Sequence, residues 1–576
     1  MASAPHRMYR ASLTVALAIA MLLTRQTHAQ LPQLAWAQGL SGVDWDEGRS
    51  VTTDTDGNVI CGGYFKELFD ADPGPGVATL TSEGGKDAFV TKLDSAGNFL
   101  WAIQLGNSED DICNVVKTDP DGNIYVGGSF FGEIDFDHGP GEHVLTSGIG
   151  GVVQDGFLMK LDPAGDLLWA VNFGGIGSCS VQALAISSDD EVYLTGYFDG
   201  FPDFDPSIGV VELQSVSMAD VFVLKLGSSG DLIWAHGFGG GNNDLGYAIA
   251  VDANGDIVFT GHHSVSVDLD PGPDEYMLTG DNDVFVAKWT ANGDFIWAKA
   301  FTGPGNSYGY GIATDQAANV LVTGYFRNDT DFDPSASGTY ILTPPGDVFD
   351  KSCFVAKLDS DGALVWAKQF GYIASQESHA IAVDDIGNVY TTGSSAFGDF
   401  DPGPDPFIIN DPGNGGAFVS KLDADGNFLW AVNLGGPGSD EGYGIALDHF
   451  GNVFTTGFHG DNADFDPGPD ISILPAVGGR DVFVAKLEQG GVGISEAAVH
   501  SSPTLYPTAV RGRFMLVGLE FAARIDIFST SGALVRSEVP RADQLTLDVQ
   551  EFPSGIYLLA ISSKHGGRQV GKFVVE

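Results

Sequence analysis

The sequence predicts an all-β protein whose main part is a seven-bladed β-propeller. Three observations carry this prediction: a tryptophan segment that recurs along the chain, short strands joined by Asp-Gly turns within each recurrence, and two incomplete repeats that complete each other. With 576 residues, 43% of them hydrophobic, the chain is long and apolar enough to bury a large core.

A Trp-Ala pair recurs seven times, at intervals of 63 to 69 residues. A lysine stands nine residues before each of the last six tryptophans, and Lys486 is a seventh such lysine with no tryptophan after it. The tryptophans are Trp36, Trp101, Trp169, Trp234, Trp297, Trp366 and Trp430. A fixed period of this length indicates a repeat architecture.

Each repeat divides into short strand-like segments. In the last repeat, apolar residues alternate over 443–448, and β-branched and aromatic residues fill 452–458 and 481–487. Complete repeats add a fourth segment, such as 427–434, after an Asp-Gly turn. Alternation with period two and Asp-Gly turns predict antiparallel hairpins. We therefore expect four antiparallel strands in each repeat.

The two ends of the repeat region are incomplete in complementary ways. The last repeat lacks a tryptophan strand, and the N-terminus has a lone tryptophan strand with no repeat before it. Pairing these two would complete the seventh blade and leave no exposed sheet edge. The sequence therefore predicts a propeller over residues 30–487 that is closed by its N- and C-terminal strands.

The repeats resemble a known family. YGIALDHFGNVFTTGF (443–458) and HAIAVDDIGNVYTTGS (379–394) are similar to the bacterial β-propeller repeat called SBBP. The resemblance extends over about residues 34–490. It implies the propeller fold and little about function, because that family is mostly uncharacterised.

The N-terminus has the pattern of a secretory signal peptide. Arg7 and Arg10 precede an apolar run at 11–23, and a short polar stretch ends in Ala29. We expect residues 1–29 to be removed after Ala29. No later segment is apolar enough to span a bilayer, so we expect an exported mature protein with no membrane span.

The four cysteines show no metal-ligand spacing. They are Cys61, Cys113, Cys179 and Cys353. We expect buried single thiols, with one disulfide as the alternative in an oxidising compartment.

The charge changes sharply near residue 500. Residues 34–499 hold 16 Lys+Arg and 69 Asp+Glu, a net charge of −53, whereas residues 500–576 carry +1. We place a linker at 488–499 and a second domain at 500–576. Short strand-like segments in this second domain predict a small Ig-like β-sandwich.

The second domain is similar to the C-terminal (type A) sorting domain of the type IX secretion system of Bacteroidetes. The matching features are Leu505-Tyr506-Pro507, IFSTSGALV (527–535), FPSGIYLLAI (552–561) and GKFVVE (571–576). The family usually continues with Asn-Pro, where this chain has Thr508-Ala509. The resemblance implies that the type IX machinery is a partner and that the protein is secreted or held on the outer cell surface.

An Asp-x-Asp pair follows the second strand of every repeat, and proline comes next in six repeats. We call these segments the DxDP loops. Aspartate and proline are typical of capped turns. Alternating aspartates are also typical ligands of calcium, which takes six to eight oxygens. The candidate metal ligands are Asp70, Asp72, Asp135, Asp137, Asp203, Asp205, Asp268, Asp270, Asp331, Asp333, Asp399, Asp401, Asp464 and Asp466.

Two of these loops offer an internal comparison. DFDPSIG (203–209) and DFDPSAS (331–337) lose the Gly-Pro of the other loops but keep both aspartates. Aspartates that were needed only for a turn would be expected to drift as well, so this retention favours calcium. The turn and the calcium interpretations both stay open.

The recurring lysine stands three residues after a phenylalanine, as in Phe89 and Lys92. This spacing places the two side chains on opposite faces of a strand. We expect the phenylalanines to pack between blades and the lysines to pair with neighbouring carboxylates.

No motif of a serine hydrolase, zinc protease, P-loop or dinucleotide site occurs. His262 and His263 are adjacent and would point to opposite faces of a strand. The acidic charge disfavours nucleic acid and anionic membranes as partners. We expect a secreted or surface-bound binding or structural module, calcium-stabilised, with a carbohydrate or protein ligand. The alternative is an extracellular hydrolase or lyase acting on polysaccharide, for which the long segment 326–353 would be the place to look.

Overall fold

The computed structural model describes residues 31–346, 350–371, 375–410 and 415–489, and short stretches of the C-terminal region. These stretches are 505–506, 509–510, 513–517, 522–529, 534–539, 544–549, 552–553, 555–563 and 568–575. The predicted signal peptide and most of the predicted linker lie outside the described residues. The chain forms two compact units, Met1–Gln489 and Gly490–Glu576.

The first unit is all-β, with seven propeller-like, four-stranded antiparallel repeats among its described residues. Repeat 1 contains β2 (Glu47–Thr53), β3 (Val59–Asp70), β4 (Thr79–Leu93) and β5 (Phe99–Leu105). Repeat 2 contains β6 (Ile112–Thr118), β7 (Ile124–Phe130), β10 (Asp155–Leu161) and β11 (Leu167–Ile176). Repeat 3 contains β12 (Cys179–Ile186), β13 (Val192–Phe198), β15 (Asp220–Leu226) and β16 (Leu232–Phe238).

The remaining repeats follow the same order. Repeat 4 contains β17 (Leu245–Val251), β18 (Ile257–His263), β21 (Asp283–Trp289) and β22 (Phe295–Phe301). Repeat 5 contains β23 (Tyr308–Thr314), β24 (Val320–Phe326), β27 (Ser352–Leu358) and β28 (Leu364–Phe370). Repeat 6 contains β29 (Gln376–Val383), β30 (Val389–Ser395), β33 (Gly416–Leu422) and β34 (Phe428–Leu434). Repeat 7 contains β35 (Glu441–Leu447), β36 (Val453–His459), β39 (Asp481–Glu488) and β1 (Gln33–Gly42).

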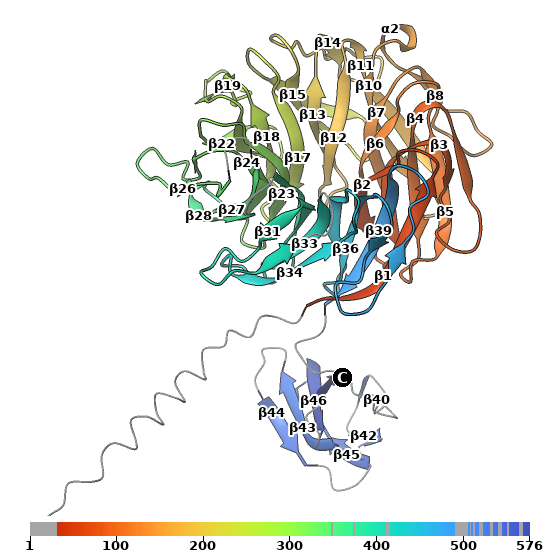
Figure 1. Cartoon of the computed structure of the whole chain (residues 1–576), viewed down its shortest axis with the longest axis vertical. Helices are drawn as coiled ribbons and strands as arrows, with labels where there is room; N and C mark the ends of the chain where they lie inside the picture. Colours follow the sequence, from red (N-terminus) through yellow and green to blue (C-terminus); the bar gives the residue numbers. More distant parts are fainter. Residues whose placement is uncertain are drawn as a thin grey trace, which may run out of the picture. The chain divides into compact units, whose positions relative to one another are not determined.

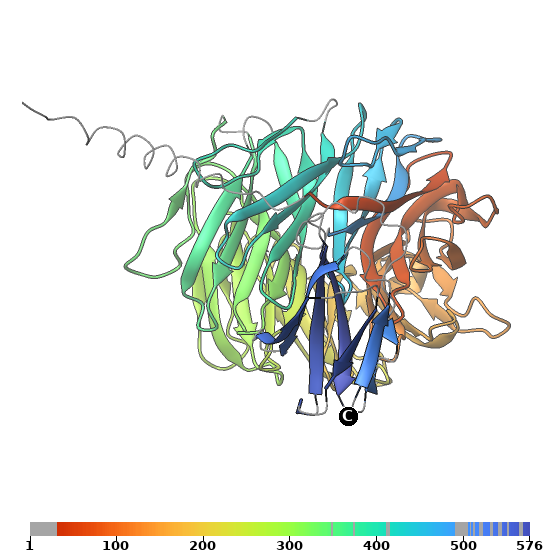
Figure 2. The same ribbon diagram turned by 90° about the horizontal axis from the view of Figure 1, so that it is seen from below.

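The N-terminal strand β1 supplies the fourth strand of repeat 7. It pairs antiparallel with β39, from Gln33 opposite Glu488 to Leu40 opposite Val482. Both views place the red strand β1 among the blue strands that end the unit (Figures 1 and 2). The first strands of successive repeats lie beside one another, and β2 of repeat 1 also lies beside β35 of repeat 7.

The recurring tryptophan docks on the following repeat. Trp36 Nε1 donates to the carbonyl of Ser95, 3.2 Å away, in the turn between β4 and β5. Gly97 in this turn has φ +83°, and a Cβ there would lie 3.0 Å from the Trp36 ring. The turn therefore requires glycine both for its backbone conformation and for the room that the indole occupies. Four other tryptophans donate in the same way: Trp169, Trp234, Trp297 and Trp366.

The recurring phenylalanines and five of the seven recurring lysines occupy the places that their spacing predicts, whereas Lys421 and Lys486 donate instead to Gln489 Oε1 and to the carbonyl of Ser95. The phenylalanines, such as Phe89, are fully buried in apolar clusters that combine residues of adjacent repeats. Lys92 Nζ lies 3.0 Å from Asp54 Oδ2, with both side chains about 95% buried. Equivalent pairs are Lys160–Asp119, Lys225–Glu191, Lys288–Asp252 and Lys357–Asp315. The carboxylate comes from the turn between the first and second strands of the same repeat.

Small strands extend the loops between the second and third strands. They are β8 (Glu133–Asp135), β9 (Val144–Thr146), β14 (Phe201–Asp203), β19 (Ser266–Asp268), β20 (Met277–Thr279), β25 (Thr330–Asp331), β26 (Ile341–Leu342), β31 (Phe397–Asp399), β32 (Ile408–Asn410), β37 (Ala463–Asp464) and β38 (Ile473–Leu474). A single helical turn, α2 (Gly148–Gly151), follows β9. The four cysteines are free and buried, which confirms the expectation of single thiols.

The second unit contains two sheets in its described residues. One combines β40 (Leu505–Tyr506), β42 (Arg513–Val517) and β45 (Gln544–Asp548). The other combines β41 (Ala509–Val510), β43 (Ala522–Ser529), β44 (Leu534–Glu538), β46 (Gly555–Ser563) and β47 (Arg568–Val575). This unit is all-β as predicted, and its Ig-like topology stays a prediction.

Candidate functional site

The seven DxDP loops share one hydrogen-bond pattern. In repeat 7, Asp464 Oδ1 accepts the backbone N–H groups of Asp466, at 3.1 Å, and Ser472, at 2.9 Å. Asp466 Oδ1 accepts the N–H of Gly468 at 2.6 Å. The other six pairs repeat the pattern: Asp70/Asp72, Asp135/Asp137, Asp203/Asp205, Asp268/Asp270, Asp331/Asp333 and Asp399/Asp401. Both aspartates therefore cap the backbone of their own loop.

This pattern explains why two loops keep their aspartates after losing the glycine. The N–H of Ser207 donates to Asp205 Oδ1, and the N–H of Ser335 donates to Asp333 Oδ1, both at 2.9 Å. A backbone N–H is all that the second carboxylate needs at this position, and serine supplies it as well as glycine. Retention of the aspartates therefore does not distinguish calcium binding from turn capping.

The DxDP loops also join neighbouring repeats. The residue between the two aspartates is fully buried in all seven, and Phe465 of repeat 7 packs 4.8 Å from Phe483, centroid to centroid. The backbone of Asp464 exchanges two hydrogen bonds, of 3.1 and 3.0 Å, with Gly435 at the end of repeat 6. Each loop thus buries one apolar side chain and caps its own turn, and in repeat 7 it is also hydrogen-bonded to the preceding repeat.

Within the described residues, no three His, Cys, Asp or Glu side chains gather closely enough to hold a metal ion. His262 and His263 are buried, and burial lowers their pKa values to about 3 and about 4. They are therefore neutral at physiological pH.

A second feature, which the sequence analysis missed, lies on the first strands. The first strand of every repeat skips one residue in its pairing with the second strand, at the same place each time. Such a β-bulge re-aims a side chain. The bulged residues are Arg49, Asn114, Gln182, Tyr247, Tyr310, His379 and Tyr443, all of them half-buried.

In repeats 4 to 7 and 1 these side chains form a continuous row. Ring centroids are 5.0 Å apart for Tyr247 and Tyr310, 5.2 Å for Tyr310 and His379, and 5.0 Å for His379 and Tyr443. The Arg49 guanidinium carbon lies 5.2 Å from the centroid of Tyr443. Tyr64, Tyr308 and Tyr325 pack against the row through Arg49 and Tyr310. We call these eight residues the tyrosine belt: Arg49, Tyr64, Tyr247, Tyr308, Tyr310, Tyr325, His379 and Tyr443.

The belt is charged as well as aromatic. His379 Nε2 lies 2.6 Å from Glu441 Oε1, and the Tyr443 hydroxyl donates to Glu441 Oε2 at 3.2 Å. Burial acts to raise the pKa of Glu441, but the hydrogen bond and charge of His379 outweigh it and hold this pKa below its usual value. Glu441 is therefore an anion that can accept hydrogen bonds at neutral pH.

Four phenol groups of the belt have no hydrogen-bond partner among the described residues: Tyr247, Tyr308, Tyr310 and Tyr325. Burial raises the pKa of Tyr247, Tyr310 and Tyr325, so these hydroxyls remain protonated. The phenols of Tyr340 and Tyr390, elsewhere in the unit, do have protein partners. None of these four oxygens is fully buried, so each hydroxyl reaches solvent, and the four together give this surface free hydrogen-bonding groups.

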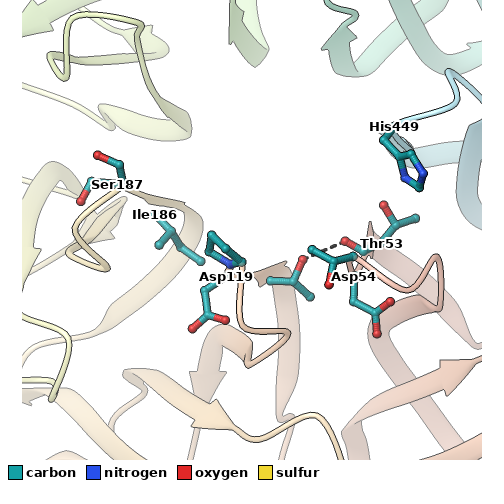
Figure 3. A pocket seen from close by; sticks show the side chains of 10 residues that line it. Thr53, Asp54, Asp119, Ile186, Ser187 and His449 are labelled. Carbon is teal, nitrogen blue, oxygen red and sulfur yellow. Dashed lines mark hydrogen bonds between the residues drawn. The ribbon is translucent and has the colours of Figure 1, made fainter. Parts of the chain in front are cut away.

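A pocket of about 650 Å³ lies at the opposite ends of the first strands (Figure 3). Turns of repeats 7, 1, 2 and 3 line it, and His449 stands across the opening from Ser187. Its two carboxylates, Asp54 and Asp119, are already paired with Lys92 and Lys160. The polar groups that the pocket offers are therefore mainly hydroxyl groups and the imidazole of His449.

The chain matches two family models. Residues 504–576 match the secretion system C-terminal sorting domain, and residues 100–129, 365–401 and 429–457 match the SBBP beta-propeller repeat. Both predicted resemblances are confirmed. The sorting domain indicates a secreted or cell-surface protein that interacts with the type IX machinery. The described residues include no helix of the length and apolarity that crossing a bilayer requires.

Two curated proteins are similar to this chain. An uncharacterized WD repeat-containing protein of Acanthamoeba polyphaga mimivirus is 24% identical over 506 residues, which covers 74% of this chain and 36% of the relative. Regulatory protein FlaEY of Caulobacter vibrioides is 26% identical over 271 residues, which covers 44% and 26%. The chain thus spans well under half the length of these relatives.

Two solved structures share a low similarity with this chain. One is PorZ of Porphyromonas gingivalis, a bacterial surface component of the type-IX secretion system, with 14% identity, a TM-score of 0.24, and coverage of 93% of this chain and 75% of that one. The other is Sqt1 of Chaetomium thermophilum, with 12% identity, a TM-score of 0.36, and coverage of 79% and 99%. Scores of this size carry no conclusion about this chain.

Proposed function

We propose that the first unit is a closed seven-bladed propeller that acts as a binding module outside the cell, with the tyrosine belt as its ligand site. The ring closure is supported by the pairing of β1 with β39 and by the contact of β2 with β35. The observation that carries the binding role is the set of four unpartnered phenols within one row of rings.

The belt has the composition of a ligand site. It combines half-buried ring faces, free hydroxyl donors and a few fixed charges, and such a mixture gives both contact area and orientation. Most of the repeated features, by contrast, find their partners within the protein, as the DxDP aspartates and five of the recurring tryptophans do. The solvent-accessible phenol groups of the belt can bond to a ligand in place of water.

The test is a binding screen of the full-length mature protein against glycan and peptide arrays, with Tyr310→Phe as the comparison. Tyr310→Phe removes one free hydroxyl and keeps the ring. A ligand that binds the natural protein and loses at least about threefold in affinity with Tyr310→Phe would support the belt as the site, since one hydrogen bond contributes about 1 kcal/mol. Binding that is unchanged in this variant would place the site elsewhere.

The His379–Glu441 pair favours one second candidate, an extracellular lyase or hydrolase acting on polysaccharide. Imidazole and carboxylate within hydrogen-bond distance are the groups that general acid–base catalysis uses. Incubation of the protein with polysaccharides and measurement of new reducing ends tests this candidate. Release that is abolished by His379→Gln would support catalysis, and no release from any substrate would leave binding alone.

Calcium at the DxDP loops stays a prediction. The backbone bonds use Oδ1 of both aspartates in every loop, so an ion would have to be held through Oδ2 together with carbonyl or water oxygens. Calorimetric titration of the full-length protein tests this. Several bound ions, with one fewer in Asp464→Asn, would establish the sites, and no heat at millimolar calcium would leave turn capping as the whole explanation.

A further inference from the structure

The basic residues of the first unit have an uneven distribution. Residues 34–499 contain only 16 lysines and arginines, and seven of these are the recurring lysines of the repeats. All three arginines in this range, Arg49, Arg327 and Arg480, lie in or beside the tyrosine belt. Lys86 and Lys351 also lie there, over the rings of Tyr64 and Tyr325 at 4.1 and 4.3 Å. Five of the nine basic residues that are not recurring lysines thus lie at one place in a region with a net charge of −53.

Three carboxylates of the belt region partly balance these cations. Glu47 pairs with Arg49 at 3.1 Å and with Arg480 at 2.7 Å. Glu377 pairs with Lys351, and Glu441 with His379. Asp110, near Lys86, is a fourth. The belt region is thus rich in cations that are paired with carboxylates, in strongly negative surroundings.

Arg49 is held in place as a donor. Its guanidinium carbon lies 5.4 Å from the Tyr64 centroid and 5.2 Å from the Tyr443 centroid, so both rings fix its plane. Its Nε is buried and has no hydrogen-bond partner among the described residues, and the same holds for Arg327 Nε. The buried Nε atoms are out of reach of a ligand, but 33% of the Arg49 side chain is exposed while its Nη2 pairs with Glu47, so an anchored guanidinium can still donate to a carboxylate or a similar planar anion.

We infer, resting on the proposed binding function, that the tyrosine belt takes an acidic oligosaccharide, with Arg49 on a sugar carboxylate. The four free phenols and the two carboxylates Glu377 and Glu441 match a ligand that carries many hydroxyl groups. The ring faces match the apolar faces of sugar rings. The surrounding negative charge disfavours densely charged polyanions and leaves room for a ligand with one charge per sugar.

The experiment is calorimetric titration of the full-length mature protein with three probes of equal length. The probes are a galacturonate hexamer, a neutral galactose hexamer and a glutamate hexapeptide. We expect the galacturonate hexamer to bind at least tenfold more tightly than the other two, and its affinity to fall as salt is raised from 25 to 500 mM. Arg49→Gln should weaken it at least tenfold, and Arg49→Lys should restore part of the loss.

Lys368→Gln is the matched control, because it removes the same charge from a lysine beside Trp366, away from the belt. It should leave the affinity unchanged, and a melting curve of each variant shows that it is folded. If the neutral galactose hexamer binds as tightly as the galacturonate hexamer, and if Tyr310→Phe but not Arg49→Gln weakens that binding, the ligand is not acidic. The proposed binding function would then still hold. If the glutamate hexapeptide binds more tightly than the galacturonate hexamer, the inference that the ligand is a carbohydrate is wrong. No binding by any probe, together with a negative array screen, would overturn both proposals.

Discussion

The DxDP loops and the tyrosine belt lie at the same end of the strands and are built in opposite ways. Every DxDP loop repeats the same aspartates and satisfies them with its own backbone. The bulge position, which supplies five of the eight belt residues, occurs once per repeat, yet the residue there changes from arginine to asparagine, glutamine, histidine or tyrosine. Repetition in this chain marks what every repeat needs to fold. The bulge position of the first strands has the same geometry in every repeat but not the same residue, and this variation marks the candidate site.

The strongest way to break the repeated framework is to remove its closing strand. A chain that begins after Gly42 would leave repeat 7 with three strands and expose an edge of β39. We expect the melting temperature to fall by more than about 10 °C or cooperative unfolding to disappear, because several kcal/mol of strand pairing and packing are lost. Thermal melting followed by circular dichroism measures this. An unchanged melting curve would show that closure contributes nothing.

A single buried ion pair should have the next largest effect. Lys92→Met removes the cation from the Asp54 carboxylate, which is about 95% buried and keeps only the hydrogen bonds from Asp56 and Asn58. We expect a loss of about 3 kcal/mol in the free energy of unfolding, measured by urea denaturation. Lys299→Met is the control, since Lys299 forms no ion pair within the described residues, and it should change stability by less than about 0.5 kcal/mol. Equal effects from the two variants would contradict a structural role for the recurring lysine.

The capping aspartates should contribute less than a buried ion pair. Asp464→Ala removes the acceptor of two backbone N–H groups and should cost about 1 to 2 kcal/mol in calcium-free buffer. Urea denaturation with chelator present measures this cost. A loss of stability that appears only when calcium is added would mean that the carboxylates serve the ion and not the turn.

Buried aspartates at equivalent positions of the third strands should make stability depend on pH. Burial raises the pKa of Asp87, Asp155, Asp220 and Asp283 to about 6. The folded protein then binds more protons than the unfolded chain between about pH 4 and 6, so the stabilisation is complete below pH 4 and is lost as the pH rises through 6. We expect the melting temperature to fall between pH 5 and pH 7.5.

Amide variants separate this effect from general charge repulsion. Asp87→Asn and Asp220→Asn keep a hydrogen-bonding group and remove the titration. Each should therefore reduce the loss in the free energy of unfolding between pH 5 and pH 7.5 by about 1 kcal/mol. If stability changes with pH in these variants just as it does in the natural protein, the whole pH dependence comes from the net charge and not from these aspartates.

The belt should show the smallest effect on stability. Tyr310→Phe removes a hydroxyl that has no partner among the described residues, so no protein hydrogen bond is lost. We expect a change of less than about 0.5 kcal/mol in the free energy of unfolding, or a slight gain. A loss of more than about 1 kcal/mol, measured by urea denaturation, would reveal a structural role for this hydroxyl.

The sequence predicted the framework because its chemistry is local and recurs. Trp36, Lys92 and the Asp-Gly turns each occur at a fixed spacing, and each spacing has one physical reading in an antiparallel sheet. The pairing of β1 with β39 followed from the two incomplete ends. The DxDP loops were also found, but the sequence alone could not show that Oδ1 of both aspartates is occupied by backbone N–H groups.

The belt escaped prediction because a β-bulge leaves no trace in the alternation of a single strand. Tyr247 and Tyr310 read as ordinary strand residues when each repeat is taken by itself. Aligning the seven first strands would have exposed one large polar or aromatic position among small and apolar ones. Which of these residues touch each other depends on how the repeats are arranged in space, and no spacing within the chain encodes it.

The measurement that tests the account most directly is a paired one. Melting temperature and galacturonate-hexamer affinity are measured for Asp464→Ala and for Arg49→Gln in the full-length protein. We expect Asp464→Ala to lower the melting temperature and leave affinity intact, whereas Arg49→Gln should lose at least tenfold in affinity and melt within a few degrees of the natural protein. The reverse result, with affinity lost in Asp464→Ala and retained in Arg49→Gln, would place the function in the DxDP loops and contradict the account.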